Sequence, residues 1–82
     1  MNKMEEKLIE LGYEKSSIWY IYEKFYTSLL LIKIDTRDLD NSRVFPSGFC
    51  GVYTQQDINN LQQAFNEMQK DLDVLRKYEN NL

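Results

Sequence analysis

The 82-residue sequence has no histidine, and cysteine and proline occur once each. The absence of histidine removes the usual general base, the commonest metal ligand and the usual side chain that titrates near neutral pH. Because Cys50 is the single cysteine, an internal disulfide and a zinc site built from several thiolates are excluded within one chain. No histidine can activate Cys50 and no basic residue lies near it in sequence, so we interpret it as a small buried thiol on a strand. We expect no enzymatic activity, no catalytic residue, no bound metal and no cofactor.

Long apolar runs are absent as well. The longest aliphatic run, Leu29 to Ile32, is far too short to cross a bilayer. The N-terminal residues also lack the apolar core of a signal peptide. We therefore expect a soluble, cytoplasmic protein that makes no membrane contact.

The composition is that of one small packed domain covering residues 1–82. Hydrophobic residues make up 43% of the chain and aromatic residues 13%, which favours a folded core over disorder. A chain of this length buries a core just large enough to fold without a metal or a disulfide. The net charge of −3 disfavours direct nucleic-acid binding, because such binding calls for a basic face.

The C-terminal third of the chain predicts one long amphipathic helix from Thr54 to Leu82. Thr54 is a favourable N-cap residue, and Asp57, three positions on, can complete a capping box. Tyr53 and Ile58 are placed to form a hydrophobic staple across this cap. Apolar residues then recur at steps of 3, 4, 3, 4 and 3 positions, which is the spacing of a coiled-coil seam. The seam consists of Ile58, Leu61, Phe65, Met68, Leu72 and Leu75.

This predicted helix is long compared with any strand of the chain. About 25 helical residues span roughly 37 Å, whereas a strand of about seven residues spans roughly 23 Å. The C-terminal half of the helix therefore needs a further cover: the N-terminal helix, a second copy of the chain or a partner protein. Charged residues between the seam positions, including Glu67, Lys70 and Asp71, are expected to lie mostly on the exposed face.

A short helix is predicted at the N-terminus. Asn2 can cap its first turn together with Glu5. Gly12 is expected to end the helix in the left-handed conformation, with Tyr13 supplying the apolar contact of such a cap. The apolar residues that share one face of this helix are Met4, Leu8 and Leu11.

Three strands are predicted between the two helices. The first covers residues 18–22, which are aromatic and β-branched, and the second covers 29–34 after a turn at 26–28. The third covers 44–53 and is interrupted at Pro46. Because the connections are too short for crossovers, the sheet is expected to be antiparallel. The fold class is α+β in the order α-β-β-β-α. The second strand should turn Leu30, Ile32 and Ile34 inward, and Leu31 and Lys33 the other way.

An acidic segment, residues 35–43, follows the second strand. Asp35, Asp38 and Asp40 carry the oxygen atoms that calcium prefers as ligands. Their spacing departs from the EF-hand pattern, which also requires a glycine and a terminal glutamate. We therefore interpret the segment as a solvated loop in which nearby arginines offset the acids.

Aromatic residues gather between positions 19 and 26. Such rings could stack on nucleic-acid bases, but that use requires interleaved basic residues, and only Lys24 is adjacent. Core packing explains about half of the rings, and the rest are candidates for a protein interface, where Tyr and Trp are enriched. The rings are those of Trp19, Tyr20, Tyr22, Phe25 and Tyr26. With the helix seam, the predicted interface residues are Trp19, Tyr20, Tyr22, Tyr26, Leu61, Phe65, Met68, Leu72 and Leu75.

The order of these features is itself informative. A short Glu/Lys-rich helix ends in Leu11-Gly12-Tyr13, and an aromatic-rich hairpin and a threonine-capped C-terminal helix rich in Gln, Asn and Glu follow. This order resembles the small uncharacterised proteins carried by phages and prophages of low-GC bacteria. Some of those proteins inhibit host defences, anti-CRISPR proteins among them. The resemblance implies an accessory protein that binds and inhibits a host protein such as a defence nuclease.

Three functions remain open from the sequence. The first is a non-enzymatic interaction module, encoded by a mobile element, that binds another protein through the aromatic sheet face or the helix seam. The second is a self-assembling homodimer, structural or regulatory, closed through the helix seam. The third is a nucleic-acid-binding protein that uses exposed aromatic residues.

Overall fold

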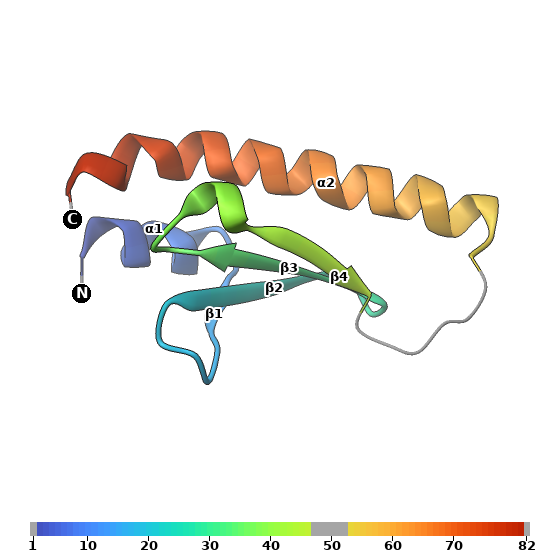
Figure 1. Cartoon of the computed structure of the whole chain (residues 1–82), viewed down its shortest axis with the longest axis horizontal. Coiled ribbons are helices and arrows are strands. Elements are labelled where there is room, and N and C mark those ends of the chain that lie inside the picture. Colours follow the sequence, from blue (N-terminus) through green and yellow to red (C-terminus); the bar gives the residue numbers. More distant parts are fainter. Residues whose placement is uncertain (1, 47–52, 82) are drawn as a thin grey trace.

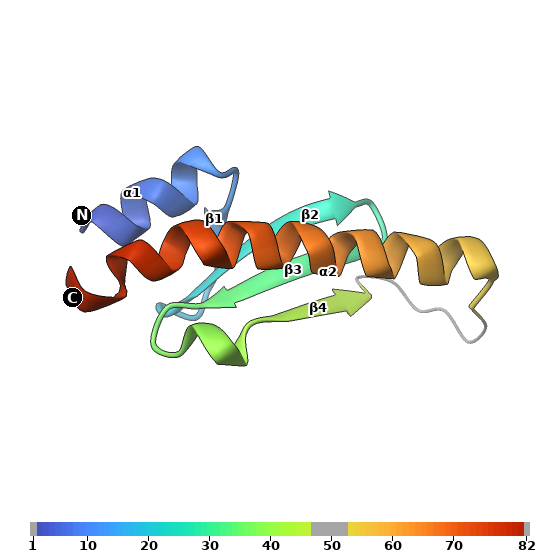
Figure 2. The same ribbon diagram turned by 90° about the horizontal axis from the view of Figure 1, so that it is seen from above.

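The computed structural model describes residues 2–46 and 53–81 and arranges them in two layers (Figure 1). One layer is a four-stranded antiparallel sheet in the order β1-β2-β3-β4. The other layer holds both α-helices, with α1 beside the C-terminal half of α2 (Figure 2). The elements in chain order are α1 Lys3–Glu10, β1 Glu14–Lys15, β2 Ile21–Thr27, β3 Leu30–Asp35, η1 Leu39–Asn41, β4 Arg43–Pro46, α2 Gln55–Leu75 and η2 Arg76–Asn81, where η denotes a 3₁₀ helix.

The predicted α+β class is confirmed, but the sheet has four strands where three were expected. The additional strand, β1, pairs with β2, and the residues predicted as the first strand mostly form the connection between the two. In that connection the amide of Ser16 donates to the carbonyl of Ile21, and the amide of Ile21 donates to the carbonyl of Ile18, both at 3.0 Å. β2 therefore begins at Ile21. It continues through Thr27, so the next turn lies at residues 28–29. The hydrogen bonds that close the β1–β2 hairpin therefore outweigh the β-propensity of the aromatic residues in its connection.

β3 lies at the centre of the sheet, and its alternation confirms the predicted faces. One set of its side chains is buried beneath the helices, and the other set is half-buried on the opposite face. The buried set is Leu30, Ile32 and Ile34, and the opposite set begins with Leu31 and Lys33.

β4 forms the edge of the sheet beside β3 and matches the start of the predicted third strand. Pro46 lies on this edge, where a missing amide donor costs no ladder hydrogen bond. The remainder of the predicted strand, residues 47–52 with Cys50, lies outside the described residues. The interpretation of Cys50 as a buried thiol therefore stays a prediction.

Both α-helices begin at the predicted caps. In α1 the amide of Glu5 donates to Asn2 Oδ1 at 2.8 Å. In α2 the amide of Asp57 donates to Thr54 Oγ1 at 3.2 Å, and the amide of Thr54 donates to Asp57 Oδ2 at 2.7 Å, which completes the capping box. α1 ends as predicted at Gly12, whose φ of +96° is the left-handed conformation that glycine adopts without strain.

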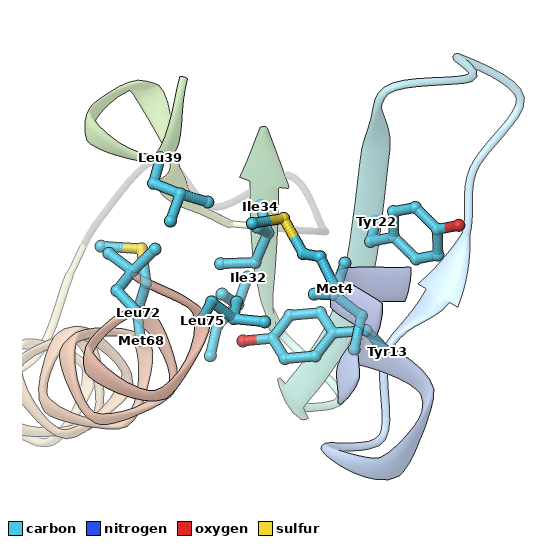
Figure 3. Packing of buried hydrophobic residues seen from close by; sticks show 10 residues of the cluster. Met4, Tyr13, Tyr22, Ile32, Ile34, Leu39, Met68, Leu72 and Leu75 are labelled. Atoms are coloured by element: carbon cyan, nitrogen blue, oxygen red, sulfur yellow. The ribbon is translucent and has the colours of Figure 1, made fainter. Parts of the chain in front are cut away.

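The core lies between the sheet, α1 and the C-terminal half of α2 (Figure 3). Side chains from all three converge there, and the short helix η1 closes one side with a buried leucine. Burial of this apolar surface is the main favourable contribution to folding. The buried apolar cluster is Met4, Leu8, Tyr13, Tyr22, Ile32, Ile34, Leu39, Met68, Leu72 and Leu75.

The long helix projects beyond the sheet at its N-terminal end, which the sequence did not predict. The 21 residues of α2 span roughly 31 Å, against roughly 23 Å for the seven residues of β2. α1 supplies the cover of the C-terminal half, so Met68, Leu72 and Leu75 are buried. Ile58 and Phe65, nearer the N-terminal end, are 42% and 43% exposed, and Figure 2 shows this end projecting beyond the strands.

Candidate interaction surface

The face of the sheet opposite the helices carries a row of apolar side chains. Successive residues of a strand point to opposite faces, so the neighbours of the core residues point away from the helices. The antiparallel register sets Phe25 opposite Leu31, and Leu31 opposite Phe45, across three strands. Phe25 is 62% exposed and Phe45 is 37% exposed. Both helices lie on the other side (Figure 1). We refer to Phe25, Leu31 and Phe45 as the apolar row.

A row of charged side chains lies two residues away along the same face. The register sets Glu14 on β1 opposite Glu23 on β2. Lys33 on β3 lies between Glu23 and Arg43 on β4. The Nζ of Lys33 lies 3.9 Å from Glu23 Oε2, an exposed ion pair of small energetic weight. Both cations also lie above the Phe45 ring, with Lys33 Nζ 5.2 Å and Arg43 Cζ 5.7 Å from its centre. We refer to Glu14, Glu23, Lys33 and Arg43 as the charged row.

A shallow hollow of about 230 Å³ lies at the end of this face where β2 begins. On its wall the guanidinium of Arg37 stacks on Tyr20, with Cζ 3.4 Å from the ring centre. Asp35, also on the wall, accepts hydrogen bonds from the amide of Arg37 at 2.9 Å and from Asn41 Nδ2 at 3.2 Å. Asp35, Arg37, Asn41 and Tyr20 on this wall therefore contact one another.

The acids of the segment that follows β3 have separate partners. Asp35 is 3% exposed, which corrects the expectation that the whole segment is solvated. Asp38 Oδ1 accepts from the amide of Asp40 at 3.1 Å and so caps η1. Asp40 Oδ1 in turn lies 2.8 Å from Arg76 Nη2. Each carboxylate therefore has a local structural role.

A buried polar cluster on the other face holds α2 against the sheet. Lys24 of β2 extends inward, with Nζ 2.7 Å from Asp71 Oδ2 and 3.3 Å from Glu67 Oε2. The same ammonium donates to the carbonyl of Leu11 at 3.1 Å. The hydroxyl of Tyr13 donates to Asp71 Oδ2 at 2.8 Å. Burial and the neighbouring Asp71 carboxylate raise the pKa of Tyr13 far above its ordinary value, so this phenol stays protonated.

The position of Asp71 corrects the expectation that it lies on the exposed face of the helix. Asp71 is 3% exposed, because it lies on the face of α2 that contacts Lys24 and Tyr13. Among the described residues, no buried side-chain nitrogen or oxygen is left without a hydrogen-bond partner. The cluster is therefore fully paired within the chain and serves to fix α2 on the sheet.

A second apolar surface lies beside the projecting end of α2. It is a groove of about 300 Å³ whose lining includes Leu61 and Phe65. The two residues of the predicted staple, Tyr53 and Ile58, are 52% and 42% exposed, so both side chains remain partly in solvent. Pro46 and Tyr53, which also line the groove, border residues 47–52 outside the described ranges. The open sheet face is the stronger candidate, because it combines the apolar row with a charged row of both signs.

The predicted interface residues lie in three environments. Trp19 is 67% exposed at the end of the molecule, where its ring meets Tyr20 edge-on at 5.2 Å, and Phe65 is also exposed. The half-buried residues are Tyr20, Tyr26 and Leu61. Those in the core, out of reach of a second molecule in this fold, are Tyr22, Met68, Leu72 and Leu75.

The sequence prediction did not select the apolar row as an interface. Phe25 belonged to the aromatic group, and Leu31 was expected to point away from the core, which the alternation of β3 confirms. Phe45 carried no signal of its own. The strand register that places the three side chains together depends on pairing between segments far apart in sequence, so local pattern could not supply it.

Comparison of the chain with protein-family models, with curated proteins and with solved structures finds no match. Within the described ranges, no helix is both long enough and apolar enough to cross a membrane.

Proposed function

We propose that the protein is a non-enzymatic interaction module that docks another protein on the open face of its sheet. The observation that carries the proposal is the apolar row. Phe25 at 62% exposure and Phe45 at 37% lie on one face with Leu31 between them, opposite both helices. Exposed aromatic residues grouped on one face are typical of a protein-binding surface, in which aromatic residues supply most of the binding energy.

The charges around the apolar row favour a protein partner over a nucleic acid. An apolar centre with charged side chains of both signs beside it matches the anatomy of a protein interface. Glu14 and Glu23 lie on the same face as Lys33 and Arg43, so a phosphate backbone laid across the row would meet two carboxylates. The net charge of −3 acts in the same direction.

The resemblance to proteins carried by phages and prophages supports a host protein as the target of such a module. In this form of the proposal the module binds and inhibits a host protein, such as a defence nuclease, by covering part of its surface.

The test is an affinity pulldown of the tagged protein from lysate of its native host, with mass spectrometry as the readout. Phe25→Ser removes the most exposed ring of the apolar row, and Phe65→Ser is the matched control, an exposed ring on α2. Neither side chain belongs to the core, so circular dichroism should show both variants folded. We expect proteins that the wild type and Phe65→Ser retain and that Phe25→Ser loses. Retention of every partner by Phe25→Ser would rule out the open face as the docking surface.

A further inference from the structure

We infer that the protein docked on the open sheet face is a second copy of this chain. The inference rests on the proposed function and concerns the free protein: the open face docks a second copy, for which a host protein would have to compete. Its basis is the sign order of the charged row. The two strands on one side of the sheet, β1 and β2, contribute carboxylates, and the two on the other side, β3 and β4, contribute cations. From β1 to β4 the signs run negative, negative, positive, positive, in the residues Glu14, Glu23, Lys33 and Arg43.

Such an order is complementary to itself under one two-fold rotation. An axis parallel to the strands and passing between β2 and β3 turns a second sheet to face the first, with β1 of one copy over β4 of the other. Each Glu14 then faces Arg43 of the second copy. Each Glu23 faces Lys33 of the second copy. Symmetric pairing of one patch with itself is the usual form of a homodimer interface.

The same rotation brings the apolar rows together. The rotation keeps each residue's position along the strands, so the apolar rows of the two copies face each other. Phe25 of each copy then lies over Leu31 of the other copy. Two sheets that pack face to face lie about 10 Å apart with their strands within about 30° of each other. At this spacing the side chains of the two facing apolar rows can interdigitate. The charged rows then pair beside this apolar contact.

The alternative two-fold axis, perpendicular to the strands, is disfavoured by the same charges. It sets every strand over its own copy. An axis over the charged row brings Glu14 to Glu14 and Arg43 to Arg43, and an axis over the apolar row leaves the charged rows of the two copies apart and unpaired. Like charges placed opposite each other are destabilising in a sheet and across an interface. The sign order therefore selects the parallel axis.

The size of the face sets the expected strength of the dimer. Four strands about 4.8 Å apart, and the seven residues of β2 at about 3.3 Å each, give a projected area of at most roughly 440 Å² per copy. A specific interface of standard size buries about 800 Å² per partner. We therefore expect a dimer that forms at high micromolar concentration and dissociates on dilution.

The test uses two variants whose charged rows have a single sign. Glu14→Lys with Glu23→Lys makes the row wholly positive, and Lys33→Glu with Arg43→Glu makes it wholly negative. All four side chains are exposed or half-buried, so circular dichroism should show both variants folded. Light scattering after size exclusion, at several hundred micromolar, should give a dimer mass for the wild type. Each variant alone should be monomeric, with a dissociation constant raised about a hundredfold or more. An equimolar mixture of the two should recover the dimer mass.

A second pair of variants tests the face without changing any charge. Phe25→Ser should leave a monomer, and Phe65→Ser should leave the dimer intact. A dimer that Phe65→Ser dissolves and Phe25→Ser does not would overturn the assignment of the second copy to the sheet face.

A wild type and a mixture that are monomeric at every concentration would also overturn it. In that case the pulldown decides the proposed function separately: a host protein lost with Phe25→Ser leaves the open face as a docking surface for a foreign protein. If the monomer instead bound an oligothymidylate, and Phe25→Ser abolished that binding, both the dimer and the protein-docking function would be overturned.

Discussion

Replacing the buried carboxylate of Asp71 should destabilise the fold far more than replacing an exposed carboxylate in an ion pair of the same length. Asp71→Asn keeps the volume of the side chain and removes its charge. The ammonium of Lys24, 15% exposed and 2.7 Å from Asp71, then keeps only the more distant Glu67 as a charged partner. Removing one member of a buried pair leaves the other charge poorly compensated in a medium of low dielectric constant.

The expected magnitude follows from burial. Breaking a buried pair costs about 3–5 kcal/mol, and the remaining contact with Glu67 lowers this to about 2–4 kcal/mol. For a domain of this size, a loss of 1 kcal/mol lowers the melting temperature by about 4–8 °C, so Asp71→Asn should lower it by roughly 8–30 °C. The total stability of such a domain is about 5–15 kcal/mol, so the variant should fold but be much weakened.

The matched control is Asp40→Asn. Asp40 lies 2.8 Å from Arg76, nearly the same distance as in the buried pair, but its side chain is 79% exposed. An exposed pair contributes little to stability because solvent screens the charges. Replacing all three buried partners with apolar residues, as Tyr13→Phe, Lys24→Met and Asp71→Leu, should recover stability to within about 1 kcal/mol of the wild type.

Urea denaturation followed by circular dichroism measures all four proteins, with the transition midpoint and slope fitted together. We expect a large loss of unfolding free energy for Asp71→Asn, a small loss for Asp40→Asn and recovery in the triple variant. Equal losses in the two single variants would refute the reasoning, because burial would then make no difference. A triple variant as unstable as Asp71→Asn would refute the role assigned to the uncompensated Lys24 charge.

Two further predictions concern pH. The raised pKa of Tyr13 stabilises the fold below its ordinary pKa of about 10, and this contribution declines as pH rises above that value, because the unfolded chain releases the proton first. Urea titrations at increasing alkaline pH should therefore show the advantage of wild type over Tyr13→Phe shrinking, and a constant difference would contradict the coupling to Asp71. At the cap of α2, the amide and then the hydroxyl of Thr54 lower the pKa of Asp57, so its contribution is present above about pH 4 and is lost as pH falls through the lowered value. Thermal melts should show wild type and Asp57→Asn converging only on strong acidification, and convergence already at neutral pH would contradict the capping box.

The starts of both helices and the end of α1 could be predicted because their signals are local, whereas the predicted run of the second helix to Leu82 was wrong, since α2 ends at Leu75 and the 3₁₀ helix η2 follows. Asn2 and Thr54 each accept from an amide three residues on, and the geometry of one helical turn determines that spacing. Gly12 ends α1 because its backbone turns left-handed there, a conformation that other residues reach only with strain. These features depend on neighbours within one turn, so the order of residues is sufficient.

The candidate site was predicted only in part. Period-two alternation assigns Leu31 and Lys33 to the face away from the core, but it does not say which residues of other strands stand beside them. That juxtaposition follows from the pairing of Leu31 with Phe25 and Phe45. The helix seam gave only part of the answer for a related reason. Its spacing shows that Met68 and Leu72 must be covered, but it does not show which element covers them.

The sequence by itself determined the α+β class, the caps of both helices, the end of α1 and the inner face of β3. Each of these depends on the chemistry of residues within a turn of helix or a few residues of strand. Only the tertiary structure decided the existence of β1, the register that assembles the apolar and charged rows, the burial of Asp71 against Lys24, and which end of α2 projects. Asp71 and Lys24 are separated by 47 positions along the chain. Their contact depends on how whole elements pack, and no local pattern contains that information.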